Sequence, residues 1–158
     1  MIRKIISGGQ TGADRAALDF AVKHNIPHGG WIPKGRKTEA GMLPTKYNLQ
    51  EMPTPEYTKC TEKNVLNADG TLILSHGPLT GGSALTVSIA TRNCKPHLHI
   101  DFEQGPLSEA AQRIRQWLQN NDIKVLNVAG PRASKDAAIY QDVIALLEMT
   151  FSQGEAEG

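Results

Sequence analysis

The stretch Ser7-Gly8-Gly9-Gln10-Thr11-Gly12-Ala13-Asp14-Arg15 decides how the beginning of this sequence folds. An apolar run at residues 2–6 precedes it, and apolar residues recur at helical spacing over residues 13–21. This order predicts a strand, a glycine-rich turn and a helix. The N-terminus of a helix has unpaired N–H groups and a partial positive charge, which suit a phosphate group. We therefore expect one wall of a ligand site to be formed by Gly8, Gly9, Gln10, Thr11, Gly12, Asp14 and Arg15.

The same turn has a second interpretation that needs no ligand. Thr11 and Asp14 fit the capping-box pattern, in which a hydroxyl at the N-cap and a carboxylate three residues later bond the first backbone N–H groups. Both interpretations can hold at once. The stretch contains neither the Gly-Lys-Ser/Thr ending of a Walker loop nor the GxGxxG dinucleotide motif.

Apolar segments that do not alternate cleanly with polar residues recur along the chain and alternate with helical patterns. Such segments are typical of parallel strands that are covered on both faces. We predict a three-layer, Rossmann-like, doubly wound α/β fold with a mainly parallel sheet of five to six strands. The predicted strands are residues 2–7, 26–32, 70–75, 97–102 and 124–129, and the later predicted helices are 57–67, 82–93, 107–118 and 139–150.

One segment, residues 33–55, interrupts this pattern. It is rich in proline, long for a plain connection, and contains one candidate short strand at 47–52. Long ordered loops often carry binding residues, and Lys34 and Arg36 lie close together here. We expect residues 1–151 to form a single domain and the polar, acidic residues 152–158 to form a flexible tail.

Two further glycine-rich turns follow predicted strands, at residues 75–83 and 127–134. The carboxyl ends of parallel strands share one edge of the sheet, where open α/β folds bind ligands. Without a ligand, Thr80, Ser83 or Ser134 would cap a helix and Arg132 would be an exposed arginine. With a ligand, the three turns form one crevice, and the added site residues are Gly77, Thr80, Gly81, Gly82, Ser83, Asn127, Gly130, Pro131 and Arg132.

Composition limits the class of protein. The 158 residues carry a net charge of +1 and are 39% hydrophobic, which is typical of one globular domain. This charge gives no bulk attraction to nucleic acid or to an anionic membrane. No apolar run has the roughly 18–20 residues that a membrane helix needs, and no signal peptide is evident. We therefore expect a cytoplasmic protein with a small-molecule partner.

The cysteines and histidines form no recognisable metal motif. Cys60 and Cys94 stand apart and are expected to remain free thiols. His97 and His99 share one face of a strand, but no third ligand stands nearby, so we expect no metal site. His28 and His76 lie near strand ends and could contact a ligand.

These motifs resemble those of the circularly permuted, YpsA-like branch of the SLOG superfamily, whose members are often labelled molybdenum carriers. The matching stretches are ISGGQTGADRAALDFAV, IPHGGWIPKGRKTEAG, TEKNVLNADGTLILSHGPLTGGSALTVSIA, KPHL and NVAGPRASKDAAIY, which span almost the whole chain. The resemblance implies a Rossmann-like fold that binds nucleotides or nucleotide-derived ligands. It also implies that Lys34, Arg36 and Asn64 reach the site, and that the protein is a homodimer or higher oligomer.

The permutation follows from the order of the turns. Gly130-Pro131-Arg132 resembles the first turn of unpermuted relatives, and Ser7-Gly8-Gly9 resembles their second turn. The resemblance therefore implies that the last strand lies close to the first in the centre of the sheet.

The resemblance leaves two classes of function. One is a binding or carrier protein for a phosphate-bearing ligand, either a nucleotide or the molybdenum cofactor (molybdopterin). The alternative is a nucleotide-processing hydrolase, similar to the phosphoribohydrolases that carry a catalytic glutamate in a GGxGTxxE loop. The comparable loop here, residues 81–86, has no acid, which favours the carrier. Candidate acids elsewhere are Asp14, Glu39, Glu62 and Asp69.

Overall fold

The computed structural model describes residues 2–157, and its side chains through Phe151. Its centre is a five-stranded sheet in the order β2-β1-β9-β7-β8, in which every neighbouring pair is parallel. The strands are β1 (Lys4–Ile6), β2 (His28–Gly29), β7 (Gly70–Ser75), β8 (His97–Asp101) and β9 (Val125–Ala129). The predicted α/β class and parallel sheet are confirmed.

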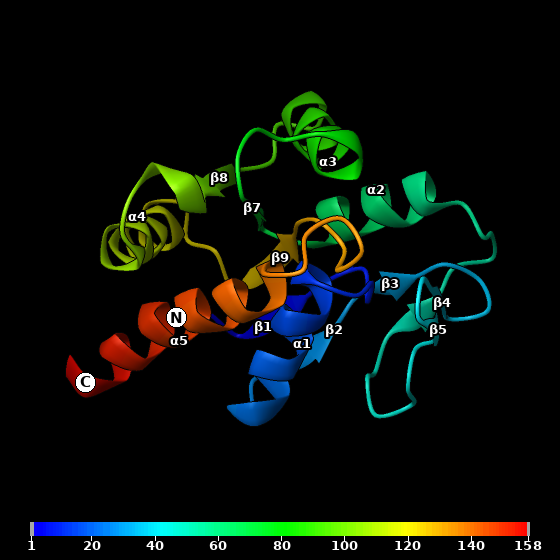
Figure 1. The fold of residues 1–158 in the computed structure, drawn as a ribbon, viewed down its shortest axis with the longest axis horizontal. Coiled ribbons are helices and arrows are strands. Elements are labelled where there is room, and N and C mark those ends of the chain that lie inside the picture. The colour runs from blue at the N-terminus through cyan, green and yellow to red at the C-terminus, as the bar shows by residue number, and fades with distance from the viewer. Residues whose placement is uncertain (1, 158) are drawn as a thin grey trace.

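Helices cover both faces of this sheet (Figure 1). They are α1 (Ala13–Lys23), α2 (Tyr57–Asn67), α3 (Gly81–Arg92), α4 (Leu107–Asn120) and α5 (Ile139–Glu157), with a short 3₁₀ turn, η1 (Phe102–Gln104). Helix α5 packs against α1 and α4 on one face, and α2 packs against α3 on the other. The result is the predicted three-layer arrangement.

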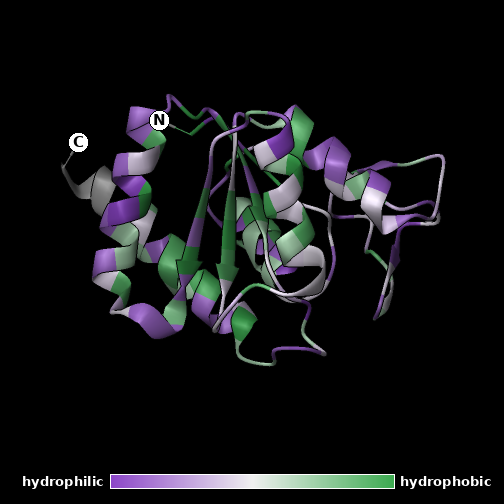
Figure 2. Cartoon of the chain, turned by 90° about the horizontal axis from the view of Figure 1, so that it is seen from above, coloured by the Kyte–Doolittle hydropathy of each residue, from purple (hydrophilic) through white to green (hydrophobic). Residues whose placement is uncertain are grey.

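The larger core lies between the sheet and the layer formed by α1, α4 and α5. Figure 2 shows hydrophobic strands between helices that are hydrophobic on one side and hydrophilic on the other. Ala13, Ala16 and Ala17 of α1 are completely buried, and their small side chains let the helix lie close to the sheet. On the other face the buried side chains include polar ones, and the Asn127 amide donates to the Thr71 hydroxyl at 3.2 Å.

Strand β9 lies between β1 and β7, although it comes last in the sequence. Ile5 pairs with Leu126 on one side of β9, and Leu72 pairs with Val128 on the other. This confirms the expected permutation, in which the last strand joins the first in the centre of the sheet.

The predicted strand at residues 26–32 is divided in two at Gly30. Gly30 has a φ of +126°, and a Cβ at this position would collide with the carbonyl oxygen of Ser7. The chain therefore leaves the central sheet after β2, and β3 (Trp31–Ile32) pairs with β6 (Gln50–Glu51). Strand β6 is shorter than the predicted strand at 47–52. An unpredicted hairpin, β4 (Lys37–Thr38) and β5 (Gly41–Met42), lies between β3 and β6.

The predicted capping box at Thr11 is wrong. Helix α1 begins at Ala13 with Gly12 as its N-cap, and no side chain bonds to the cap. Thr80 does occupy the N-cap position of α3, again without a side-chain bond, and Ser134 precedes α5 by several residues. The start of α1 is instead held by a backbone contact, the bond from Ala13 N–H to the Pro131 carbonyl at 3.2 Å.

Two further sequence expectations concern membrane-spanning helices and the C-terminal tail. Among the described residues, no helix combines the length and the apolar character needed to cross a membrane. The tail predicted at 152–158 falls on residues whose side chains, and in Gly158 the backbone too, lie outside the described part. The single-domain boundary at 151 therefore stays a prediction.

Two glycine variants should separate steric clash from backbone strain. Gly30 and Gly35 both have positive φ, but a Cβ at Gly35 would meet nothing within 4 Å. We expect Gly35→Ala to lower the free energy of unfolding by about 1 kcal/mol, the cost of a left-handed non-glycine residue. Gly30→Ala should cost at least about 3 kcal/mol, because the backbone must also move away from Ser7. Urea unfolding of both variants measures this difference, and equal losses would contradict the role given to Gly30.

Candidate functional site

A cavity of about 390 Å³ opens at the carboxyl ends of β1, β7 and β9. Its walls come from the turn after β1, the loops after β7 and β9, and the facing sides of α2 and α3. The three glycine-rich turns singled out in the sequence therefore meet around one space, as the geometry of parallel strands requires. A cavity of this size lies within the range of small-molecule sites.

Eleven of the predicted site residues line this cavity. They are Gly8, Gln10, Asp14, Asn64, Thr80, Gly82, Ser83, Asn127, Gly130, Pro131 and Arg132. Their position agrees with a shared site, and their contact with a ligand stays a prediction.

The other predicted site residues lie outside the cavity lining: Gly9, Thr11, Gly12, Arg15, Lys34, Arg36, Gly77 and Gly81. Arg36 has a different partner, because its guanidinium donates four hydrogen bonds of 2.8–3.3 Å to carbonyl oxygens of residues 43–49. The Arg15 guanidinium lies over the Tyr47 ring. A Cβ at Gly9 would approach Leu49 at 2.9 Å, so this glycine serves packing.

Sequence reasoning missed several residues of the cavity wall. Tyr57, Cys60 and Thr61 line the cavity together with Asn64, and Lys135 and Asp136 lie on the opposite loop. Positions 57, 60, 61 and 64 have the spacing of one helix face, so the sequence did carry a signal for α2. Lys135 lies in the matched stretch at residues 127–140, directly after the turn at 127–134, so the sequence placed it near the site without singling it out.

Three N–H groups of the turn at residues 8–12 have side-chain acceptors on or beside the turn. Gly9 N–H donates to the Ser7 hydroxyl at 3.3 Å, Gln10 N–H to the Asp14 carboxylate at 3.2 Å, and Thr11 N–H to the Gln10 side-chain oxygen at 3.0 Å. These donors are not free for a phosphate in this conformation. These hydrogen bonds stabilise the turn as one wall of the cavity.

The start of α3 is different. The N–H groups of Gly81, Gly82 and Ser83 have no acceptor among the described residues, and Thr80 gives no side-chain cap. A Cβ at Gly82 would meet nothing within 4 Å, and one at Gly81 would meet only the Lys135 ammonium, at 3.8 Å. Unpaired N–H groups, the helix dipole and a nearby cation together favour an anion at this end of the cavity.

Glu39 ties the β4–β5 hairpin to the loop after β9. Its carboxylate accepts hydrogen bonds from the Thr11 hydroxyl, from the Ser134 hydroxyl at 2.5 Å and from Ser134 N–H at 3.1 Å. The Arg132 guanidinium lies 3.6 Å away. The bonds from Ser134, followed by the bond from Thr11, hold the pKa of Glu39 below its ordinary value. This candidate acid is therefore ionised and committed to the loop.

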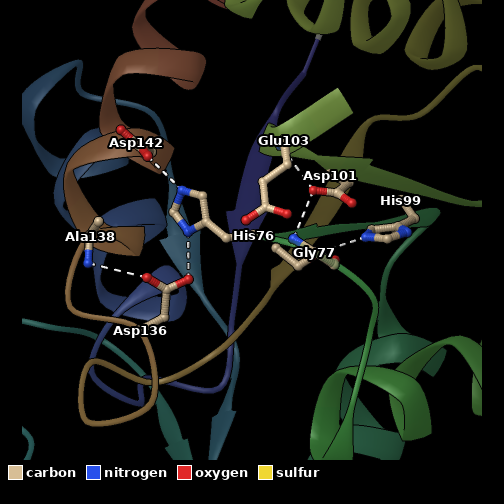
Figure 3. A network of polar contacts seen from close by, with 9 residues as sticks. His76, Gly77, His99, Asp101, Glu103, Asp136, Ala138 and Asp142 are labelled. Atoms are coloured by element: carbon tan, nitrogen blue, oxygen red, sulfur yellow. Dashed lines mark hydrogen bonds and ion pairs between the residues drawn. The ribbon is translucent and has the colours of Figure 1, made fainter. Parts of the chain in front are cut away.

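His76 joins the loop after β7 to the start of α5 (Figure 3). Its ring nitrogens lie 2.5 Å from the Asp136 carboxylate and 2.6 Å from the Asp142 carboxylate, and the ring packs on Phe102. Burial lowers the pKa of His76, but the two carboxylates raise it by more, so the net pKa is above the ordinary value. Asp136 is thereby occupied, although it borders the cavity.

The neighbouring strand end is also held by internal bonds. Gly77 N–H donates to the Asp101 carboxylate at 2.8 Å, and the His99 ring lies 2.7 Å from the Ser75 hydroxyl (Figure 3). His28 lies away from the cavity and accepts from Asn48 N–H at 3.1 Å. Within residues 2–157, no group of three or more His, Cys, Asp or Glu side chains could hold a metal ion.

Asp14 is the carboxyl group at the inner wall of the cavity. Burial raises the pKa of Asp14 to about 7, although the bond from Gln10 N–H and the charge of Arg15 oppose this. The neighbouring Cys60 thiol donates to the Trp31 carbonyl at 2.7 Å, and burial together with the Asp14 charge raises its pKa to about 12. Cys60 is therefore a protonated, structural thiol, whereas Asp14 changes charge near neutral pH.

Asp14→Asn should change how stability depends on pH. Because the folded pKa of about 7 exceeds the ordinary value of 3.8, the wild type is most favoured below pH 4 and loses stability as pH rises through 7. For a fully buried group, a pKa shift of this size corresponds to about 4 kcal/mol in the free energy of unfolding. Because solvent screens a carboxylate at an open cavity wall, we expect on the order of 2 kcal/mol here.

Urea unfolding near pH 4 and near pH 8 measures this effect. The asparagine variant should gain about 2 kcal/mol over the wild type at the higher pH and little at the lower. His76 and the other titrating groups are common to both proteins and cancel in the difference. Parallel pH profiles would show that Asp14 does not titrate in the folded protein near pH 7.

Comparison with known proteins places this fold and cavity in a family. Residues 5–151 match the model of the circularly permutated YpsA SLOG family. The chain is also similar to a protein of known crystal structure, described as "Putative molybdenum carrier protein", from Syntrophus aciditrophicus SB, solved at 1.45 Å. The two share 61% identity over 95% of each chain, with a TM-score of 0.94. A search of the curated proteins finds no match. The chain therefore belongs to the circularly permuted YpsA branch of the SLOG superfamily.

Proposed function

We propose that this protein binds a nucleotide or a nucleotide-like, phosphate-bearing small molecule in the cavity, and that it acts as a carrier or binding protein. The size of the cavity, its place at the carboxyl ends of the strands and the family membership support this proposal. One observation carries it: the start of α3, whose first N–H groups have no acceptor among the described residues, borders the cavity beside Lys135.

The phosphate belongs at the start of α3 rather than at the turn of residues 8–12. Three consecutive N–H groups of that turn, those of residues 9–11, already have acceptors, whereas those of residues 81–83 do not. Lys135 and Arg132 border the same cavity and supply positive charge. Arg132 is partly neutralised by Glu39, so Lys135 is the more available cation.

The molybdenum cofactor is a candidate cargo, because the similar protein from Syntrophus aciditrophicus carries a molybdenum-carrier name. A pterin phosphate has the same two parts as a nucleotide, a heterocycle and a phosphate, and meets the same requirements of the cavity. Native mass spectrometry of the freshly purified protein, combined with metal analysis, distinguishes these cargoes. Co-purified molybdenum would identify the first, and a nucleotide mass without molybdenum the second.

A hydrolase that cleaves the N-glycosidic bond of nucleotides is the second candidate. Asp14 favours it, because a carboxyl group with a pKa of about 7 at a cavity wall suits general acid–base catalysis. The loop at residues 81–86 opposes it, since no acid stands there. We expect no free adenine from AMP over several hours. Release of adenine that Asp14→Asn abolishes would replace the carrier proposal.

The cellular setting follows from the same proposal. We infer a cytoplasmic protein without nucleic-acid partners, because the net charge of +1 gives no bulk attraction to phosphate backbones. We also infer a homodimer or higher oligomer, an expectation that rests on the family resemblance. Light scattering of the purified protein measures the mass, and a monomer at micromolar concentration would contradict the oligomer.

Lys135→Met should weaken the binding of a phosphorylated ligand more than that of its dephosphorylated form. A charge-assisted contact contributes about 1.5–3 kcal/mol, so AMP affinity should fall roughly tenfold to a hundredfold while adenosine affinity changes little. Lys59→Met is the matched control, because Lys59 is exposed on α2 and does not border the cavity. Isothermal calorimetry measures both ligands, and an equal loss for AMP and adenosine would remove Lys135 as a phosphate partner.

A further inference from the structure

Asp14 has unused capacity to accept hydrogen bonds at the cavity wall. One carboxylate oxygen, Oδ2, accepts from Gln10 N–H at 3.2 Å, and Oδ1 has no donor among the described residues. An ionised carboxylate can accept about four hydrogen bonds. A half-buried carboxylate with one donor is therefore short of partners, and a ligand that brings N–H groups would supply them.

The neighbouring polar groups on the same wall are already in use. The Asn64 amide accepts from Trp31 N–H at 2.8 Å and donates to the Trp31 carbonyl at 3.0 Å. The Cys60 thiol donates to that same carbonyl. Asp14 is thus the member of this group that can still accept from a bound molecule.

Gly8 keeps Asp14 open to the cavity. A Cβ at this position would lie 3.0 Å from Asp14 Oδ2 and 3.7 Å from the Asn64 amide nitrogen. Gly8 does not have a left-handed φ, so its backbone conformation would accept another residue. What the glycine provides is space in front of the carboxylate.

The charges around the cavity favour one orientation of a bound ligand. Arg132, Lys135 and the start of α3 attract a phosphate, whereas the Asp14 carboxylate repels one. The ligand is therefore favoured with its phosphate towards α3 and its remaining polar edge towards Asp14.

We propose, resting on the function proposed above, that Asp14 selects ligands whose heterocycle presents adjacent N–H donors, as the N1–H and 2-amino groups of guanine do. Pterins carry the same edge. Adenine presents the acceptor N1 beside its single 6-amino donor, and a carboxylate facing the N1 lone pair is repelled. A site that bonds N–H groups rejects analogues that leave its own polar group unpaired.

The pH dependence of binding follows from the same contact. N–H donors favour the carboxylate form and lower the pKa of Asp14 from its raised value near 7, so guanine affinity should rise with pH through neutrality. Arg15 on the same helix and Cys60 on α2 also face Asp14.

The remaining charged groups of the cavity are Arg132, Lys135 and the His76–Asp136 pair. They lie on the loops after β7 and β9, together with the ligand phosphate that we place at α3. Their titration affects GMP and AMP alike, because both nucleotides carry the same phosphate. The ratio of the GMP affinity to the AMP affinity therefore reports the contribution of Asp14.

Calorimetric titration with GMP and AMP near pH 6 and near pH 8 tests the assignment. The wild type should prefer GMP by at least about tenfold near pH 8 and by less near pH 6. Asp14→Asn should reduce the preference to about twofold or less at both pH values. Glu62→Gln is the matched control for replacing a carboxylate by an amide, since Glu62 does not border the cavity, and it should behave as the wild type.

Gly8→Ala provides a second, independent variant. Its methyl group would crowd Asp14 without changing any charge, so the preference for GMP should fall while thermal unfolding reports an intact fold. Equal binding of GMP and AMP by the wild type, or an unchanged preference in Asp14→Asn, overturns the assignment and leaves the proposed function standing. If neither nucleotide binds, the assignment fails. The proposed function fails with it only if native mass spectrometry of the freshly purified protein also finds neither a nucleotide nor molybdenum.

Discussion

The site depends on the close approach of the backbone segments at the ends of β1, β7 and β9. At Gly12, a Cβ would collide with the Pro131 carbonyl, and at Gly130 it would lie 2.6 Å from both Ala13 Cβ and the Leu74 carbonyl oxygen. Because neither glycine has a side chain, the ends of β1, β7 and β9 meet directly. The cavity is the space that these joined turns leave beside α2 and α3.

The polar groups around this space fall into two sets with different partners. The N–H groups of residues 9–11 bond to side chains of residues 7–14. The side chains of His76, Glu39 and Arg36 bond to loops, so all of these groups hold the walls in place. The start of α3 and Asp14 line the cavity and keep donors and acceptors without a partner among the described residues. Buried polar groups are normally paired inside a protein, so unpaired ones at a cavity point to water or a ligand as partner.

Periodicity and the spacing of glycine-rich turns were sufficient to predict the parallel sheet and its helices, since these depend on patterns along the chain. The permutation was predicted from the resemblance of the turns to those of unpermuted relatives. The errors concern contacts between distant segments. Gly30 ends a strand because of the Ser7 carbonyl, and Thr11 bonds to Glu39 instead of capping α1. The Arg36 guanidinium donates to carbonyl groups of its own loop, and no sequence motif predicts these bonds. Site residues were predicted where a glycine-rich turn marked them and missed where only the fold brings them together.

The central position of β9 has a consequence for the synthesis of this chain. Until residues 125–129 leave the ribosome, β1 pairs only with β2, and β7 only with β8, so the sheet exists as two separate halves. Each half then exposes an unpaired strand edge, and Leu126 and Val128 are missing from the core. Completion of the core therefore requires contacts of long sequence separation, which are slow to form. Until β9 has been synthesised, the nascent chain therefore exposes strand edges that favour aggregation.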